Sequence, residues 1–489
     1  NAARSHGFAM LGDEFILAPA QATMTAPAFL LFGAHGDLAL RMLWPSLFRL
    51  HCDGSLPEEM ALYGVSRSGT TAELHAHLHK ALADELNEGN RHRLDAFLAK
   101  TEFVNLDAGH AADYAGLADI LQRAGRHVAI SYLSMPPDLF TPIVANLQSA
   151  GLIDPRTRVI LEKPIGKNLA SSRAISDGVA GALAETQTYR IDHYLGKEAV
   201  QNLLALRFGN AIFEPLWNSH HIESVHITIA ESLGIGGRWS YYDKSGALRD
   251  MVQNHMLQLI SLIAMEPPVN GSSEAIRNEK IKVLQALHPI NEANFADRVI
   301  FGQYTASADG SMPGYNEEAD AAEASDTETF VAIKAHVDNW RWKGVPFYLK
   351  TGKRLASKHT EVIITFKEVP QFLFGQKPDA DLCNRLVIQM QPDESITLEI
   401  FNKTPDVHEF VLKPVALNLE INEAGNGKVR HIAYERLIRD AIKGDRTLFV
   451  RRDELEQAWA WIDQIHAARK AAQAPLLHYP AGCHGPDFE

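Results

Sequence analysis

The chain has 489 residues, of which 46% are hydrophobic and 22% are charged. This is the composition of a globular protein with two or three domains, and it excludes a disordered or low-complexity chain. The 60 acidic residues exceed the 47 basic ones, which gives a formal net charge of −13. This charge argues against a general nucleic-acid binder, although a local basic pocket can still bind an anionic substrate.

Cysteine usage indicates the cellular compartment. Cys52, Cys383 and Cys483 lie far apart and form no CxxC pair. Isolated reduced thiols are therefore the expected state, and we expect a cytoplasmic protein without a metal site. No apolar run approaches the roughly 18 residues that span a bilayer, so we expect no membrane association.

The first 23 residues differ from the rest of the chain. Their apolar stretch is interrupted by Asp13 and Glu14, which argues against the hydrophobic region of a signal peptide. Met24 opens a more natural start. We expect residues 1–23 to be a leader or extension outside the fold.

The first half of the chain alternates short apolar runs with helical stretches such as 140–152. Buried strands that alternate with helices are typical of βαβ units and a parallel sheet. The pattern continues to about residue 198. We therefore predict an α/β, Rossmann-like dinucleotide-binding domain over residues 24–198. Its predicted strands are 28–32, 61–65, 127–137 and 157–164.

The second half changes to segments in which apolar and polar residues alternate, a pattern typical of half-exposed antiparallel strands. Helical stretches flank these segments. We predict an α+β domain over residues 199–489, with a large, mostly antiparallel sheet that serves substrate binding and oligomerisation. The predicted strands are 221–231, 329–337, 361–369, 384–391 and 395–402, and the predicted helices are 197–208, 247–265 and 453–470.

A glycine-containing loop follows the first predicted strand and opens a helix. It reads Gly33-Ala34-His35-Gly36-Asp37-Leu38. Glycines let the backbone approach a pyrophosphate, and a helix N-terminus offers unpaired N–H groups to an anion. The loop is not a complete GxGxxG, so a tight turn without a ligand is equally consistent with it.

Arg67 follows the second predicted strand. An acidic residue at this place is typical of NAD-binding domains, whereas a basic residue can bind the 2′-phosphate of NADP. The sequence thus favours NADP and leaves NAD as a second coenzyme. A solvated surface arginine is the alternative interpretation.

Five segments resemble motifs of the glucose-6-phosphate dehydrogenase family, and they follow one another along the chain in the same order as in that family. The densest is RIDHYLGKEAVQNLLALRFGNAIFEPLWN at 190–218, which resembles the family signature. FGAHGDLA (32–39) resembles its coenzyme loop, and EKPIGKNLASS (162–172) its Glu-Lys-Pro motif. RDMVQNHMLQL (249–259) resembles its catalytic helix, and FYLKTGKRL (347–355) a later substrate segment. The resemblance covers the chain from Met24 onward.

The resemblance implies an enzyme that oxidises D-glucose 6-phosphate at C1 to 6-phospho-D-glucono-1,5-lactone. Hydride passes to NADP, and this is the first step of the pentose-phosphate and Entner–Doudoroff routes. His255 matches the general base, and Asp192 matches the carboxylate that orients it. The family also implies a homodimer or homotetramer. Residues matching the substrate site are Lys163, His193, Tyr194, Lys197, Glu231, Asp250, Lys353 and Lys358; Arg67, Pro136 and Lys163 match the coenzyme side, together with the loop 33–38.

The chemistry of these residue types agrees with that reaction. The pKa of an unperturbed histidine lies near neutrality, which suits a general base, and lysines can bind a dianionic phosphate. Helical spacing, however, places His255 on an apolar face, where histidines are more often structural. His35 and Phe140 depart from the usual family residues on the coenzyme side, which leaves the coenzyme preference open.

Two other functions remain as alternatives. A sugar oxidoreductase of the wider Glu-Lys-Pro class would act on an unphosphorylated sugar, but Lys197 and Lys358 argue against it. A catalytically silent protein that senses NADP would not need Asp192, His255 and Lys163.

Overall fold

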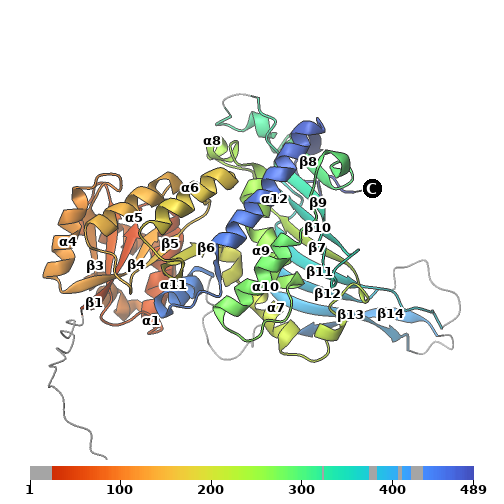
Figure 1. Ribbon diagram of the computed structural model, residues 1–489, viewed down its shortest axis with the longest axis horizontal. Coiled ribbons are helices and arrows are strands. Elements are labelled where there is room, and N and C mark those ends of the chain that lie inside the picture. The colour runs from red at the N-terminus through yellow and green to blue at the C-terminus, as the bar shows by residue number, and fades with distance from the viewer. Residues whose placement is uncertain (1–24, 322–323, 374–382, 406–409, 420–432, 489) are drawn as a thin grey trace, which may run out of the picture.

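A computed structural model describes residues 25–321, 324–373, 383–405, 410–419 and 433–488. The expected leader at 1–23 lies outside the described residues. Figure 1 shows two sheet-based parts side by side, one in red and orange and the other in green to blue. Among the helices of the described ranges, none is long and apolar enough to cross a membrane.

The first sheet has seven strands in the order β15-β6-β5-β4-β1-β2-β3. All neighbours are parallel except β15, which runs antiparallel to β6. Residues 28–32 of β1 are at most 1% exposed, as expected for a strand covered on both faces. The predicted Rossmann-like architecture is confirmed. Its strands are β1 (Ala26–Phe32), β2 (Ala61–Ser66), β3 (Thr101–Asn105), β4 (Arg126–Leu133), β5 (Arg158–Leu161), β6 (Thr188–Ile191) and β15 (Phe449–Val450).

Helices surround this sheet and connect its strands (Figure 1). The predicted helix at 140–152 is present as α5, which buries Phe140, Ile143, Val144 and Leu147. The helical elements are η1 (Ala39–Leu43), α1 (Trp44–Cys52), α2 (Thr71–Ala81), α3 (Leu94–Ala99), α4 (Asp113–Arg123), α5 (Phe140–Ser149) and α6 (Leu169–Ala180), with short turns η2 (Ala83–Glu85), η3 (Arg91–Arg93), η4 (Pro137–Leu139) and η5 (Glu185–Gln187).

The second sheet has nine strands in the order β14-β13-β12-β11-β7-β10-β9-β8-β16. Its neighbours are antiparallel except for the pairs β7–β10 and β8–β16. Strand β12 buries every second residue, as the alternating sequence predicts. The large, mostly antiparallel sheet is thus confirmed. Its strands are β7 (Ile222–Ala230), β8 (Val299–Thr305), β9 (Phe330–His336), β10 (Pro346–Gly352), β11 (His359–Phe366), β12 (Arg385–Gln391), β13 (Ser395–Lys403), β14 (Leu412–Leu419) and β16 (Leu477–Pro480).

One group of helices covers one face of this sheet, and α12 extends across to the first part of the molecule (Figure 1). Helix α12 packs against α6, α10 and the segment η8. The elements are η6 (His193–Gly196), α7 (Glu198–Phe208), η7 (Glu214–Leu216), α8 (Trp239–Tyr242), η8 (Leu248–Met256), α9 (Leu257–Ala264), α10 (Ser273–Gln285), η9 (Glu292–Asn294), η10 (Tyr315–Glu317), α11 (Ala433–Lys443) and α12 (Arg452–Ala471).

The C-terminal part of the chain returns to the first sheet. Helix α11 packs on α1 and η6, and β15 forms the sheet edge beside β6. The last described segments therefore join both parts of the molecule. The division into domains at residues 198 and 199 stays a prediction.

The segment η8 differs from a regular α-helix. The sequence predicts one helix over 247–265, but residues 248–256 are wound as a π-helix before α9 begins. The i→i+5 bonds of a π-helix bring residues five apart onto neighbouring positions of one face. Asp250 and His255, five residues apart, consequently line the same cavity.

Candidate active site

A cavity of about 370 Å³ lies where the two parts of the molecule meet. Its walls come from the loop after β5, the turn η6, the end of β7, the segment η8 and the loop after β10. The fold thereby brings together eight residues that the sequence predicts for a substrate and catalytic site. These are Lys163, His193, Tyr194, Glu231, Asp250, His255, Lys353 and Lys358.

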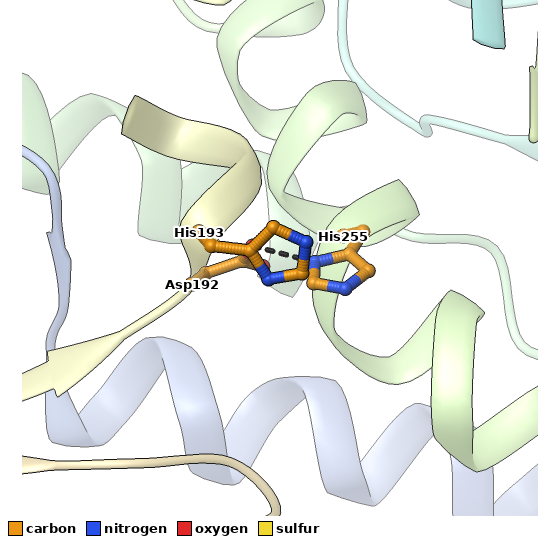
Figure 2. Close-up of side chains that lie close together, drawn as sticks. All are labelled: Asp192, His193 and His255. Atoms are coloured by element: carbon orange, nitrogen blue, oxygen red, sulfur yellow. Dashed lines mark hydrogen bonds and ion pairs between the residues drawn. The ribbon is translucent and has the colours of Figure 1, made fainter. Parts of the chain in front are cut away.

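Asp192 and His255 form a buried pair beside this cavity. Asp192 Oδ1 lies 2.5 Å from His255 Nδ1, and each residue is 1% exposed. The backbone N–H of Tyr194 also donates to Asp192 Oδ1, at 2.9 Å, because Asp192 caps the turn η6. Figure 2 shows the Asp192–His255 bond as a dashed line, with the His193 ring beside it. The hydrogen bonds from the Tyr194 N–H and from the His255 ring together fix the Asp192 carboxylate.

The neighbours of His255 determine its tautomer. A carboxylate only accepts hydrogen bonds and an ammonium only donates them. Asp192 therefore faces a proton on Nδ1, whereas the Lys163 ammonium, 2.9 Å from Nε2, faces a lone pair. Lys163 also donates to the backbone carbonyl of Asp250 at 3.1 Å. The ring is thus held with a basic nitrogen directed toward the cavity.

Burial and neighbouring charge set the protonation of this pair. Burial lowers the pKa of His255, and the Asp192 carboxylate opposes only part of that effect. Burial by itself would raise the pKa of Asp192, but the charge and hydrogen bond of His255 lower it to about 2. At neutral pH the carboxylate is ionised and the imidazole is neutral, as a general base requires.

Aromatic contacts hold the base from its other side. The Tyr194 ring stacks on His255 with centroids 4.1 Å apart, and the His193 ring meets it edge-on at 4.6 Å. Burial lowers the pKa of His193 well below its usual value. Lys197 does not line the cavity wall; its Nζ lies 4.1 Å from the centroid of the Tyr194 ring.

The opposite wall carries alternating charges. The Lys353 ammonium donates to Glu231 and lies 3.7 Å from Asp250 Oδ2. Asp250 Oδ1 lies 3.5 Å from Lys163 Nζ, so one carboxylate connects the two lysines. Lys358 is exposed at the rim. Carboxylates that face ammonium groups in this way can bind a ligand with several hydroxyl groups.

The predicted coenzyme loop borders a second cavity, of about 560 Å³. Gly33 has φ +78°, and a Cβ there would lie 2.3 Å from Ser134 O, so only glycine fits. Arg67 is exposed at the end of β2 and lines this cavity together with Gly33, His35 and Pro136. A tight glycine turn with an exposed guanidinium nearby fits a phosphate-rich dinucleotide.

Other residues of the loop do not reach this cavity. Ala34 is wholly buried, and its carbonyl accepts from Trp44 Nε1. Asp37, where helical winding begins, lies 3.4 Å from Arg41 on the surface. Neither Gly36 nor Leu38 is a wall residue. His35 packs on Phe103, with centroids 5.0 Å apart, so an aromatic surface occupies this loop position.

Sequence reasoning missed several wall residues of the sugar-sized cavity. Arg238 and Tyr241 come from the segment after β7, and Gln391 ends β12. Gln391 arrives through sheet register, since it pairs with Thr360 of β11. The run Gly236-Gly237-Arg238 could have pointed to Arg238 as a wall residue, because it places a cationic side chain directly after two glycines of a turn.

Asp192, His193 and His255 also form a group with metal-ligand spacing, since their ligand atoms lie within 4.8 Å of one another. The Lys163 ammonium beside His255 Nε2 would repel a cation there. The expectation of a metal-free site stays a prediction.

Comparison with known proteins agrees with the motifs. The family model described as "Glucose-6-phosphate dehydrogenase, NAD binding domain" matches residues 30–202, and "Glucose-6-phosphate dehydrogenase, C-terminal domain" matches residues 204–489. The chain is 46% identical to glucose-6-phosphate 1-dehydrogenase of Zymomonas mobilis, over 95% of this chain and 96% of that protein. It is 45% identical to that of Mycolicibacterium smegmatis, over 94% of each. A solved structure of glucose-6-phosphate dehydrogenase in complex with glucose 6-phosphate superposes with a TM-score of 0.87 at 34% identity, covering 95% of this chain and 96% of that one.

Proposed function

The chain belongs to the glucose-6-phosphate dehydrogenase family, and from this premise we propose that it oxidises D-glucose 6-phosphate at C1 to 6-phospho-D-glucono-1,5-lactone, with hydride transfer to NADP. The observation that carries the proposal is the Asp192–His255 pair, whose tautomer leaves the lone pair of Nε2 at the cavity wall, where the Lys163 ammonium now faces it. This assignment makes His255 the general base and Asp192 its supporting carboxylate.

Each side chain of the pair has a separate task. The C1 hydroxyl takes the place of the Lys163 ammonium at His255 Nε2 and transfers its proton to that nitrogen. Asp192 stabilises the imidazolium that forms and keeps the ring in orientation. Lys163, displaced from Nε2, stays beside the reacting centre through its bond to the Asp250 carbonyl.

The remaining wall residues bind the sugar phosphate, together with Lys197 beside the Tyr194 ring. Glu231, Asp250 and Lys353 form one charged wall and contact the sugar hydroxyls. His193, Tyr194, Lys197 and Lys358 bind the phosphate. Lys358 is exposed at the rim, where a dianion can reach it without the cost of burying an unpaired charge.

The residues that line the coenzyme cavity fit NADP: the Gly33 turn, His35 and Pro136 would hold the dinucleotide, and the Arg67 guanidinium would pair with its 2′-phosphate. When bound, NADP supplies the hydride acceptor. NAD could serve as a second coenzyme, because it shares the pyrophosphate that the glycine turn would bind.

Initial rates of reduced-coenzyme formation test the proposed function. Glucose 6-phosphate should be turned over with NADP, and glucose under the same conditions should not. Comparable kcat/KM for the two sugars would instead support the sugar oxidoreductase. Tight NADP binding without turnover of any sugar phosphate would support the silent sensor.

Replacing Arg67 with Ala tests the coenzyme assignment. Loss of one charge-assisted hydrogen bond should raise KM for NADP about tenfold and leave KM for NAD unchanged. Arg123→Ala, at an exposed position of α4, is the matched control. Equal changes for both coenzymes would show that Arg67 does not recognise the 2′-phosphate.

We also propose a homodimer or homotetramer that forms through the face of the second sheet opposite its helices. This face carries a broad groove of about 1150 Å³, where His226 and Tyr348 stack with centroids 4.7 Å apart. Tyr348→Glu should lower the mass measured by light scattering toward that of one chain, 54.1 kDa. Val269→Glu, in the exposed turn between α9 and α10, should not. A wild-type mass of one chain would refute the proposed homo-oligomer.

The cytoplasm is the proposed location of the protein, and cell fractionation tests it.

A further inference from the structure

A small cavity of about 30 Å³, distinct from the sugar-sized cavity and from the coenzyme cavity, lies behind the catalytic pair. It shares the wall residue Lys163 with the sugar-sized cavity. Its walls come from the end of β6, from η8 and α9, and from α12. The residues that matter for its chemistry are Asp192, Arg190, Gln253 and Gln258.

Each of these four residues has a buried polar atom that lacks a hydrogen-bond partner within the described ranges. The atoms are Asp192 Oδ2, Arg190 Nε, Gln253 Nε2 and Gln258 Oε1. Asp192 is 1% exposed and Gln258 is 2% exposed. Buried polar atoms are nearly always paired with protein or with ordered water. Four residues with such atoms line one cavity, which indicates a shared partner.

The size and chemistry of the cavity identify this partner. A buried water needs roughly 10–15 Å³, so the cavity has room for about two. Its walls offer two acceptors, from Asp192 and Gln258, and two donors, from Arg190 and Gln253. A cation would meet the positive charges of Arg190 and Lys163, and an anion would meet Asp192. Water can satisfy both kinds of group.

We infer that ordered water fills this cavity and links Asp192 Oδ2 to Gln253 and Gln258, which makes the two glutamines positioning residues for the catalytic pair. The inference rests on the proposed function, in which this pair is the general base. His255 Nδ1 and the Tyr194 N–H occupy Oδ1, so the water would hold the remaining oxygen and fix the plane of the carboxylate.

The linked water also affects the basicity of the pair. A hydrogen bond donated to Oδ2 stabilises the ionised carboxylate. Without it, a proton binds the pair more tightly, whether on Asp192 or on His255. Because only the unprotonated pair can accept the substrate proton, the loss of activity on the acid side would begin at higher pH. Other titratable or charged groups face the pair and are unchanged by a glutamine substitution. They are Glu162, Lys163, Arg190, His193, Tyr194, Lys197, Asp250 and Tyr434.

Gln258→Met and Gln253→Met keep similar volume and remove the hydrogen bonds. We expect each to lower kcat about tenfold, as for other residues that orient a functional group through a second contact. The midpoint of the acid limb of kcat should rise by about half a pH unit. KM for glucose 6-phosphate and for NADP should stay the same. Gln285→Met, at an exposed position of α10, is the matched control. If one variant fails to fold, as judged by its melting temperature, the other still tests the same water.

A high-resolution crystal structure of the wild-type protein supplies an independent readout. Density within hydrogen-bond distance of Asp192 Oδ2, lost in Gln258→Met, would support the inference. An empty cavity, a direct Gln253–Asp192 bond, or an acid limb that neither variant moves would overturn it. If the wild-type protein did not turn over glucose 6-phosphate, the proposed function would be refuted. The electron density near Asp192 Oδ2 would then show by itself whether ordered water fills the cavity.

Discussion

His255→Asn should lower kcat about 10³–10⁴-fold, the range expected for loss of a positioned general base and its carboxylate support. KM for glucose 6-phosphate should change by no more than about twofold, because the side chain makes its main interaction in the transition state. Stopped-flow or steady-state rates of reduced-coenzyme formation measure kcat. The melting temperature shows whether the variant is folded.

The control for this variant is His79→Asn, at an exposed position of α2. It changes the same atoms far from the cavity and should keep wild-type kcat. Turnover of His255→Asn at the wild-type rate would remove His255 as the base. A large rise in KM with unchanged kcat would show that it only binds the sugar.

The double variant Lys197→Gln and Lys358→Gln should lower kcat/KM for glucose 6-phosphate about 10²–10⁴-fold. Charge-assisted hydrogen bonds to a dianion contribute about 1.5–3 kcal/mol each, which is roughly 10–150-fold for each lysine. Any slow turnover of glucose should stay unchanged, because glucose lacks the phosphate. The ratio of the two kcat/KM values is therefore the quantity to measure.

Lys470→Gln, at the exposed end of α12, is the matched control for the lysine variants. Each single lysine variant should show part of the loss, and their effects need not add because both contact one phosphate. An unchanged ratio in the double variant would mean that other groups, such as Arg238 of the cavity wall, bind the phosphate.

The site residues show how far sequence reasoning reached. Asp192 and Lys163 follow strands of one parallel sheet, and the carboxyl ends of such strands meet at one edge, so their proximity could be expected. Gln391 could not be expected, since it reaches the cavity through pairing with Thr360 across β11 and β12. The small cavity behind Asp192 was equally hidden, because its wall combines β6, η8 and α12.

The π-helical winding of η8 also could not be predicted from the sequence. A periodicity of 3.6 residues puts His255 on an apolar face with Leu248, Met251 and Leu259, and it separates His255 from Asp250. Only the observed winding brings the charged residue Asp250 and the base to one wall. Winding of this kind depends on what packs against the helix rather than on local propensity.

The sequence by itself determined the alternation of strands and helices in the first half, the half-exposed strands in the second, and the residue types of the site. These follow from local hydrophobic periodicity and from motifs, which reside in neighbouring residues. Only the tertiary structure decided that β15 returns to the first sheet, that Asp250 and His255 share a wall, and that four residues with buried polar atoms line one small cavity. Those features arise from contacts between residues far apart in the chain, and packing energy rather than local preference selects them.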